Sequence, residues 1–255
     1  MGGHRGGVGD DESQTYLVSV SDLMAGLIFL FIITLMIFVF RYQSAAAEIR
    51  SANETRHHLL ETLQDSLRMR GLKVEIDDRT GVLRLTEKSI NFPVGSSEPE
   101  LDHIPRVRVL AEILAKVLPC YVPTGGHCPT RRSPDLAGEI QALMIEGHTD
   151  TLHLGSGSRL RNNLELSGAR AATIERLLIG FDPVLDSLRN QDSLKILSIS
   201  GYGAERLLDP KDPLTEKNRR IDLRFIMEAP RPVSSQRLPE PVRLTTDSLR
   251  ARERR

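Results

Sequence analysis

The sequence predicts a mixed α/β protein, α/β or α+β in class, with one membrane-spanning helix near its N-terminus. An apolar run from Tyr16 to Phe40 predicts the helix, and beyond Gly71 strand-like and helix-like segments alternate. A chain of 255 residues holds one ordinary domain with accessory segments, because single domains usually take about 100–200 residues. We expect an N-terminal segment (1–15), a transmembrane helix (16–41), a juxtamembrane helix or linker (42–71), an α/β domain (72–228) and a disordered basic tail (229–255).

The composition argues against several classes of function. The chain has 34 Lys and Arg against 34 Asp and Glu, and this balance argues against nucleic-acid binding, which needs an excess of positive charge. Aromatic residues make up 4% of the chain and Trp is absent, so there is little material for a base-stacking surface. Two cysteines exclude a disulfide-rich mini-protein and a zinc site made of four thiolates.

The apolar run is long enough to cross a bilayer. Its roughly 25 residues, at about 1.5 Å each, match a hydrocarbon layer of about 30 Å. Asp22 raises the free energy of membrane insertion by about 2.5–3.5 kcal/mol. Thirteen Leu, Ile, Phe and Val residues after it favour insertion and outweigh that cost. A cleaved signal peptide is the alternative, because Ala45 and Ala47 form an Ala-x-Ala pattern. The run is too long for one, however, and acidic residues precede it.

A helical pattern continues beyond the span. Residues 43–70 contain no Pro or Gly, and apolar residues recur at partly helical spacing: Ile49, Leu59, Leu60, Leu63 and Leu67. We expect a juxtamembrane stalk helix that ends at Gly71. Two such helices could pair through this stripe in a homodimer, although the spacing is irregular for a coiled coil.

The segments after Gly71 predict a sheet covered by helices on one side, in the order β-α-β-α-β-β. A hairpin comes first, and a loop rich in Pro, Gly, Thr and Arg interrupts the later part. The expected elements are the hairpin of Leu72–Asp77 and Val82–Glu87, a helix at Ile104–Leu118, an insertion loop at Cys120–Gly138, a strand at Ile140–Glu146, a helix at about Leu160–Ile179, and strands at Leu194–Ile199 and Ile221–Met227. The basic tail is solvated chain in our reading, with specific binding as the alternative.

Two stretches, 145–178 and 218–225, carry the motifs. A strand ending in Gly-His-Thr-Asp is followed by a loop and by Asn-x-x-Leu-Ser-x-x-Arg-Ala opening a helix, then by Gly-Tyr-Gly and Asn-Arg-Arg. From about Ile90 to Met227 this pattern resembles the OmpA-like peptidoglycan-binding domain. The resemblance implies that Asp150 and Arg170 grip the amine and carboxylate of the diaminopimelate side chain in the stem peptide. It also implies that four further residues line the same groove: Thr149, Asn163, Leu166 and Arg219.

The chemistry of these residues agrees with ligand binding. A zwitterionic centre needs a cation and an anion a few ångströms apart, and an Arg fork suits a carboxylate. The alternative is that Asp150 and Arg170 form only a structural salt bridge. His148 has no second ligand at helical spacing, so a structural role is favoured over zinc binding. No Ser-His-Asp or Cys-His order and no carboxylate pair stands out, so we expect no enzyme, metal or cofactor.

The resemblance places the domain outside the cytoplasm, where disulfides persist. Cys120 and Cys128 lie eight positions apart, so we expect a disulfide between them, with two free thiols as the alternative. The expected location is the inner membrane, with a cytoplasmic N-terminus and a periplasmic domain. This overrules the weak charge signal of Arg5 before the span and Arg41, Arg50 and Arg56 after it, which favours the opposite orientation.

The span itself carries a second resemblance. Ser-Asp-Leu-Met-x-Gly at its start, followed by a juxtamembrane helix and an OmpA-like domain, resembles the B subunit of flagellar-motor-type stators. The stretch VSVSDLMAGLIFLFIITLMIF is most similar to B subunits of the Zorya anti-phage defence system. The resemblance implies two B chains inside a ring of multi-span A subunits, with Asp22 carrying the translocated ion. A proton is favoured because only Ser19, Ser21 and Thr34 offer further side-chain oxygens in the span, and sodium is the alternative if the partner supplies more ligands. The alternatives are an interfacial Asp22 in a passive single-span anchor, and a flagellar stator that serves motility.

Overall fold

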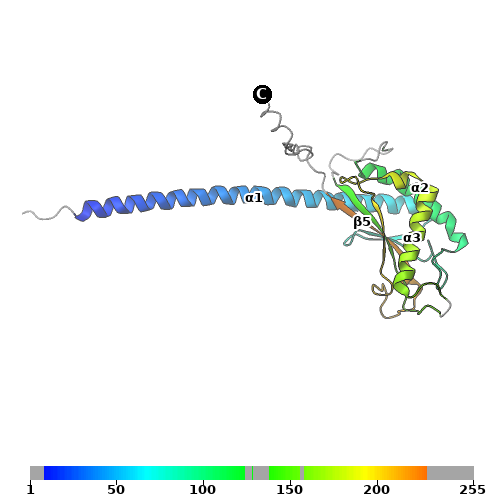
Figure 1. Ribbon diagram of the computed structural model, residues 1–255. Helices are drawn as coiled ribbons and strands as arrows, with labels where there is room; N and C mark the ends of the chain where they lie inside the picture. The colour runs from blue at the N-terminus through cyan, green and yellow to red at the C-terminus, as the bar shows by residue number, and fades with distance from the viewer. Residues whose placement is uncertain (1–8, 124–127, 129–137, 156–157, 229–255) are drawn as a thin grey trace, which may run out of the picture. The chain divides into compact units, whose positions relative to one another are not determined.

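The computed structural model describes residues 9–123, 128, 138–155 and 158–228, in two compact units (Figure 1). The units are Met1–Ile49 and Arg50–Arg255. Helix α1 (Gly9–Met69) begins in the first unit and ends in the second. Each unit is described below by itself.

The described part of the first unit is helical. From Leu23 to Phe40 the large apolar side chains are exposed, among them Phe31 and Phe38. Among the described residues, α1 is the single helix long and apolar enough to cross a membrane. Such a surface is stable in hydrocarbon rather than in water, so this segment could span a bilayer. Asp22 lies at its start and is also exposed.

The second unit is built on a five-stranded sheet. The strands are β1 (Val74–Asp77), β2 (Val82–Leu85), β3 (Glu139–Gly147), β4 (Leu197–Gly201) and β5 (Ile221–Glu228). Their order across the sheet is β1-β2-β5-β3-β4, with β3 and β4 parallel and the other neighbours antiparallel. Ile145 is opposite Leu223 and Glu146 is opposite Asp222, so apolar and charged residues gather on opposite faces.

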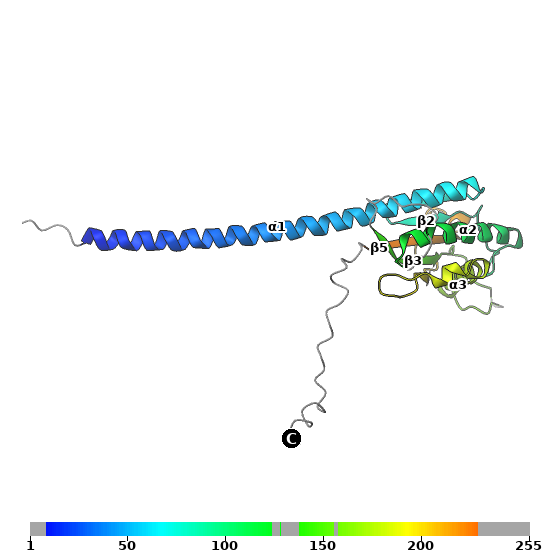
Figure 2. The same cartoon turned by 90° about the horizontal axis from the view of Figure 1, so that it is seen from above.

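Helices cover the apolar face, as the sequence predicts. Helix α3 (Asn163–Phe181) packs on β3 and β4, and α2 (Ile104–Val117) packs on α3 (Figure 2). The shorter helices are η1 (Leu101–His103), η2 (Leu118–Tyr121), α4 (Val184–Ser187) and η3 (Glu216–Asn218). The core contains Leu83, Leu223 and Phe225 from the sheet, all 0–1% exposed. The class is therefore α/β, and the hairpin supplies two strands, giving β-β-α-β-α-β-β.

The last turns of α1 differ from the expected stalk. Leu59, Leu60, Leu63 and Leu67 are fully buried in the same core as the sheet residues. They therefore do not form a stripe that is free to pair two chains, and the compact unit begins at Arg50 rather than at residue 72. The physical reason is that the hairpin and α2 leave part of the apolar face uncovered, and this helix covers it.

The remaining elements fall within a few residues of their predicted positions. Helix α3 begins at Asn163 instead of about Leu160, and β4 begins at Leu197 instead of Leu194. The expected disulfide between Cys120 and Cys128 is present. Most of the expected insertion loop, the basic tail and residues 1–8 lie outside the described residues.

Two glycines bring α3 close to the ends of β3 and β4. A Cβ atom at Gly147 would lie 2.0 Å from the carbonyl oxygen of Ser167, and one at Gly201 would lie 2.6 Å from the amide nitrogen of Gly168. Both neighbours are backbone atoms in α3, which cannot move away cheaply. Any other residue at these positions would push the helix off the sheet.

We predict that Gly147→Ala lowers the free energy of unfolding by about 1–3 kcal/mol or more, because the methyl group overlaps α3. Gly168→Ala is the matched control, since a Cβ there meets nothing within 4 Å and alanine favours a helix. The measurement is urea unfolding of the full chain in detergent micelles, followed by tyrosine near-ultraviolet circular dichroism. Equal stability of the two variants would contradict the close contact.

Candidate ligand-binding site

The polar residues that follow β3 are held in place by backbone hydrogen bonds. The His148 amide donates to the Arg220 carbonyl at 3.0 Å, and the Thr149 amide donates to the Gly203 carbonyl at 2.9 Å. Thr149 and Asp150 are both at least nine-tenths buried. The end of β3 therefore presents these side chains in one fixed arrangement.

Helix α3 supplies the opposite wall. Its N-cap is Asn162, whose side chain accepts a hydrogen bond from the Glu165 amide at 2.9 Å and so fixes where the helix begins. Asn163, Leu166 and Arg170 follow at spacings of three and four and therefore share one helix face. The Asn163 side chain donates to the carbonyls of Asp150 and Leu152, at 3.1 and 3.0 Å, and ties the loop to the helix.

A cavity of about 110 Å³ lies between these walls, and all six predicted groove residues line it. They are Thr149, Asp150, Asn163, Leu166, Arg170 and Arg219. Val94, Gly95 and His153 line it as well, and the sequence motifs gave no signal for them. Ligand pockets for whole small molecules are usually about 300–1,000 Å³. This cavity therefore suits the charged end of a side chain rather than a whole small molecule.

The partner of Asp150 is Arg219. Arg219 Nη1 lies 2.8 Å from Asp150 Oδ2, and the other carboxylate oxygen accepts from the Leu152 amide at 3.0 Å. The structural salt bridge considered between Asp150 and Arg170 is not formed, because the guanidinium of Arg170 donates elsewhere. Asp150 and Arg170 remain two separate charges on one cavity.

Arg170 is almost fully buried, at 1% exposure. Its Nε donates to the Ser96 carbonyl at 2.9 Å and Nη2 donates to the Pro93 carbonyl at 3.2 Å, while the guanidinium lies 4.9 Å from the centre of the Phe92 ring. Burial lowers the pKa of Arg170 to about 10; the Asp150 carboxylate opposes this shift and Arg219 adds to it. The side chain therefore stays cationic at neutral pH, and two of its nitrogens are held by backbone carbonyls.

Three buried polar atoms around the cavity have no hydrogen-bond partner among the described residues. They are Thr149 Oγ1, Arg170 Nη1 and Arg219 Nε. An unsatisfied buried polar group costs about 1–3 kcal/mol, so a water molecule or a ligand usually completes such atoms. Two guanidinium donors, one hydroxyl and the Asp150 carboxylate form a set that matches a ligand carrying both a carboxylate and an ammonium group.

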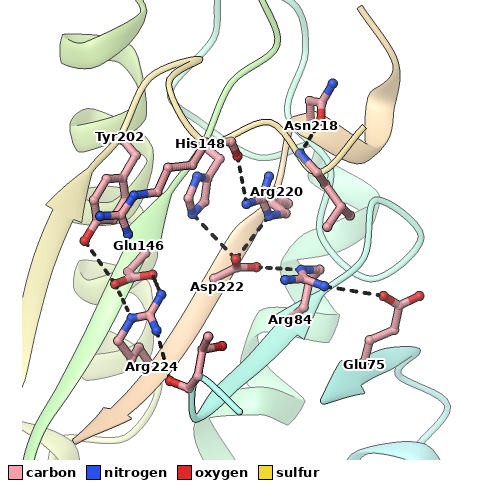
Figure 3. A network of polar contacts seen from close by, with 12 residues as sticks. Glu75, Arg84, Glu146, His148, Tyr202, Asn218, Arg220, Asp222 and Arg224 are labelled. Carbon is pink, nitrogen blue, oxygen red and sulfur yellow. Dashed lines mark hydrogen bonds and ion pairs between the residues drawn. The ribbon is translucent and has the colours of Figure 1, made fainter. Parts of the chain in front are cut away.

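On the face of the sheet opposite the apolar core, a second polar cluster surrounds Glu146 and Asp222 (Figure 3). Arg224 binds both carboxylate oxygens of Glu146, through Nε at 2.7 Å and Nη2 at 2.8 Å, and the Tyr202 hydroxyl donates to the same carboxylate at 3.2 Å. Asp222 Oδ2 accepts from Arg220 Nε at 3.1 Å. Bidentate, charge-assisted contacts of this kind fix strand register as well as side-chain position.

Glu146, His148 and Asp222 lie close enough together to hold a metal ion. Three guanidinium groups, from Arg84, Arg220 and Arg224, surround the two carboxylates, so the cluster already carries excess positive charge. A further cation is electrostatically unfavourable there. The cluster therefore fits a structural network better than a metal centre.

His148 is a neutral member of this network. Its pKa is lowered from 6.5 to about 3, first by burial and then by Arg220, Arg206, Arg84 and Arg224. The 3.5 Å contact from Nε2 to Asp222 is therefore not an ion pair at neutral pH. The ring stacks on Tyr202 with centroids 5.2 Å apart, so His148 contributes packing directly before Thr149.

This pKa predicts acid sensitivity. The unfolded chain protonates this imidazole as pH falls through about 6.5, whereas the folded protein protonates it only near pH 3. Stability therefore falls as pH drops from about 6.5 toward 3, by up to about 1.4 kcal/mol per pH unit from this group. In His148→Gln the free energy of unfolding should decline less steeply over that window in urea titrations at several pH values.

His153→Gln is the control for that experiment, since it removes an exposed histidine that lies outside the network. A slope in His148→Gln equal to that of the wild-type chain would contradict the assignment of His148 as a buried neutral group.

Comparison with known proteins gives only structural neighbours. No protein-family model and no curated protein matches the chain. The periplasmic domain of Helicobacter pylori MotB is 21% identical, with 63% of this chain and 83% of that chain covered and a TM-score of 0.42. A MotB-like protein from Desulfovibrio vulgaris is 19% identical, with 71% and 98% covered and a TM-score of 0.47. The cell wall anchor of the type VI secretion system from Pseudomonas aeruginosa is 15% identical, with 68% and 97% covered and a TM-score of 0.40.

Proposed function

We propose that this chain anchors a membrane complex to peptidoglycan by holding the diaminopimelate residue of the stem peptide in the cavity between β3 and α3. The observation that carries this proposal is the set of three unpartnered buried polar atoms beside the Asp150 carboxylate. The motif resemblance suggests diaminopimelate as the ligand, and the hydrogen-bond donors of the cavity support this choice on independent chemical grounds.

Each end of a zwitterionic ligand has a matching group. The carboxylate accepts from the free guanidinium nitrogens of Arg170 and Arg219 and from the Thr149 hydroxyl. The ammonium group donates to the carboxylate of Asp150, which also pairs with Arg219. Leu166 and Val94 line the same cavity and contact the methylene chain of the ligand. Recognition is therefore by charge at the tip and by apolar contact along the chain.

We further propose that the chain is the B subunit of a proton-driven, stator-like motor in the inner membrane, most similar in its span to Zorya defence B subunits. Asp22 is the one charged residue between Leu17 and Phe40. An ionisable residue in a lone span marks an ion path by default, and the membrane potential supplies about 2.3 kcal/mol per charge per 100 mV. A multi-span A subunit ring around two B chains would enclose Asp22, with the N-terminus cytoplasmic and the α/β unit periplasmic.

The wall contact is tested with two conservative substitutions. Thr149→Val removes a hydroxyl that has no partner among the described residues, and Asp150→Asn removes the negative charge at similar size. We expect the affinity of the full chain for purified sacculi to fall about tenfold or more for Asp150→Asn, because breaking a buried charge pair costs about 2–5 kcal/mol. A smaller loss is expected for Thr149→Val, with unchanged or higher stability.

Glu175→Gln, a charge change on α3 away from the cavity, is the control and should bind sacculi as wild type does. If both site variants also bind like wild type while remaining folded, the groove is misassigned.

The motor role is tested at Asp22. Asp22→Asn keeps the size of the side chain and removes its titratable charge, so we expect normal insertion and loss of phage protection in cells that carry the A subunit. Asp22→Glu retains a titratable group and should keep part of the activity. Full protection by the Asn variant would exclude ion carriage by Asp22. A motility defect without loss of protection would assign the complex to a flagellar stator instead.

A further inference from the structure

A second and larger cavity, of about 530 Å³, lies in the α/β unit and shares no lining residue with the candidate site. Four segments form it: the last turns of α1, the hairpin of β1 and β2, the turn at 86–88 that follows β2, and the chain from Leu208 to Arg220. Its volume falls within the range of about 300–1,000 Å³ that is usual for small-molecule sites.

The lining of this cavity is strongly basic. Six cationic residues contribute: Arg68, Lys73, Arg84, Lys88, Lys217 and Arg220. Against them stand Glu75, Glu87 and Asp209 in the lining and the buried Asp222, which pairs with Arg84 and Arg220, so two positive charges remain in excess. Like charges that face one cavity repel, and an anion relieves that repulsion.

Two of these arginines, Arg84 and Arg220, also belong to the polar network of Figure 3, in which both contact Asp222. Arg84 lies between Asp222, at 3.3 Å, and Glu75, at 3.9 Å. Arg220 is 6% exposed and binds Asp222 through Nε at 3.1 Å and the Arg206 carbonyl through Nη2 at 3.1 Å. Its remaining nitrogen, Nη1, is buried and has no partner among the described residues. The arginines are thus oriented before any ligand arrives.

The other four cations lie at the rim and are exposed. None of Arg68, Lys73, Lys88 and Lys217 makes an ion pair within the described part of the chain. Because these four come from separate segments, one compact ligand with several charges can contact more of them than a single monovalent ion can.

We propose that this cavity binds a small polyanion, a molecule that carries two or more phosphate or carboxylate groups. The oriented arginines bind one anionic group through their guanidinium donors, and the rim lysines bind the others as mobile point charges. The bound molecule ties the 208–220 segment to the hairpin. This inference stands on residues outside the stem-peptide cavity and does not depend on the proposed function.

The test is a calorimetric titration of the full chain in detergent micelles with inorganic tripolyphosphate. We expect saturable binding that weakens as salt is raised, because the rim contacts are exposed to solvent. The Lys73→Glu and Lys217→Glu double variant should bind about tenfold or more weakly, since two attractions become repulsions. It substitutes only exposed residues, and circular dichroism confirms that the variant is folded.

A matched double variant, Lys116→Glu with Arg159→Glu, makes the same change in net charge outside the cavity and should bind as wild type does. If both double variants lose affinity for tripolyphosphate equally, the loss reflects overall charge and the proposed site is wrong. Citrate in place of tripolyphosphate distinguishes carboxylate from phosphate ligands. Binding only to anionic phospholipid vesicles or to a glutamate-rich peptide, with neither small polyanion bound, would also overturn the proposal.

Discussion

The contact between Gly147 and Ser167 sets the geometry of the candidate site. Because no side chain separates the end of β3 from α3, the residues directly after Gly147 face the first turns of the helix. Ser167 also accepts a hydrogen bond from the Gly203 amide at 2.8 Å, which brings the exit of β4 to the same point. At this separation Thr149 and Arg170 line one small cavity.

The two faces of the sheet carry different kinds of side chain. Alternation along β5 places Leu223 in the apolar core and Asp222 in a buried charged network, one residue apart. Burying charge is expensive unless it is paired, and here each carboxylate meets at least one guanidinium group. The arginines that balance Asp222 also form the floor of the basic cavity. One network therefore supports the strand register, the position of His148 and an anion-binding surface.

Sequence patterns predicted the elements well because strand and helix periodicity depend only on neighbours along the chain. The ordered motifs likewise named six residues that line one cavity. The patterns and motifs could not predict contacts between distant segments. Arg219 pairs with Asp150 from 69 positions away, and Arg170 is held by the carbonyls of Pro93 and Ser96, which leave no side-chain signal. The stripe of Leu59 and Leu63 predicted a helix correctly but not the surface on which it packs, because periodicity says nothing about the partner.

An open sheet has two outer strands, and here both are short. β1 has four residues, two of them acidic, and β4 has five residues, two of them serine. Long, flat, apolar outer strands recruit strands from other molecules, whereas short and charged ones do not. The two outer strands therefore offer little length for edge-to-edge pairing between copies of this unit. This limit on edge pairing comes from strand length and is independent of anything that the unit binds.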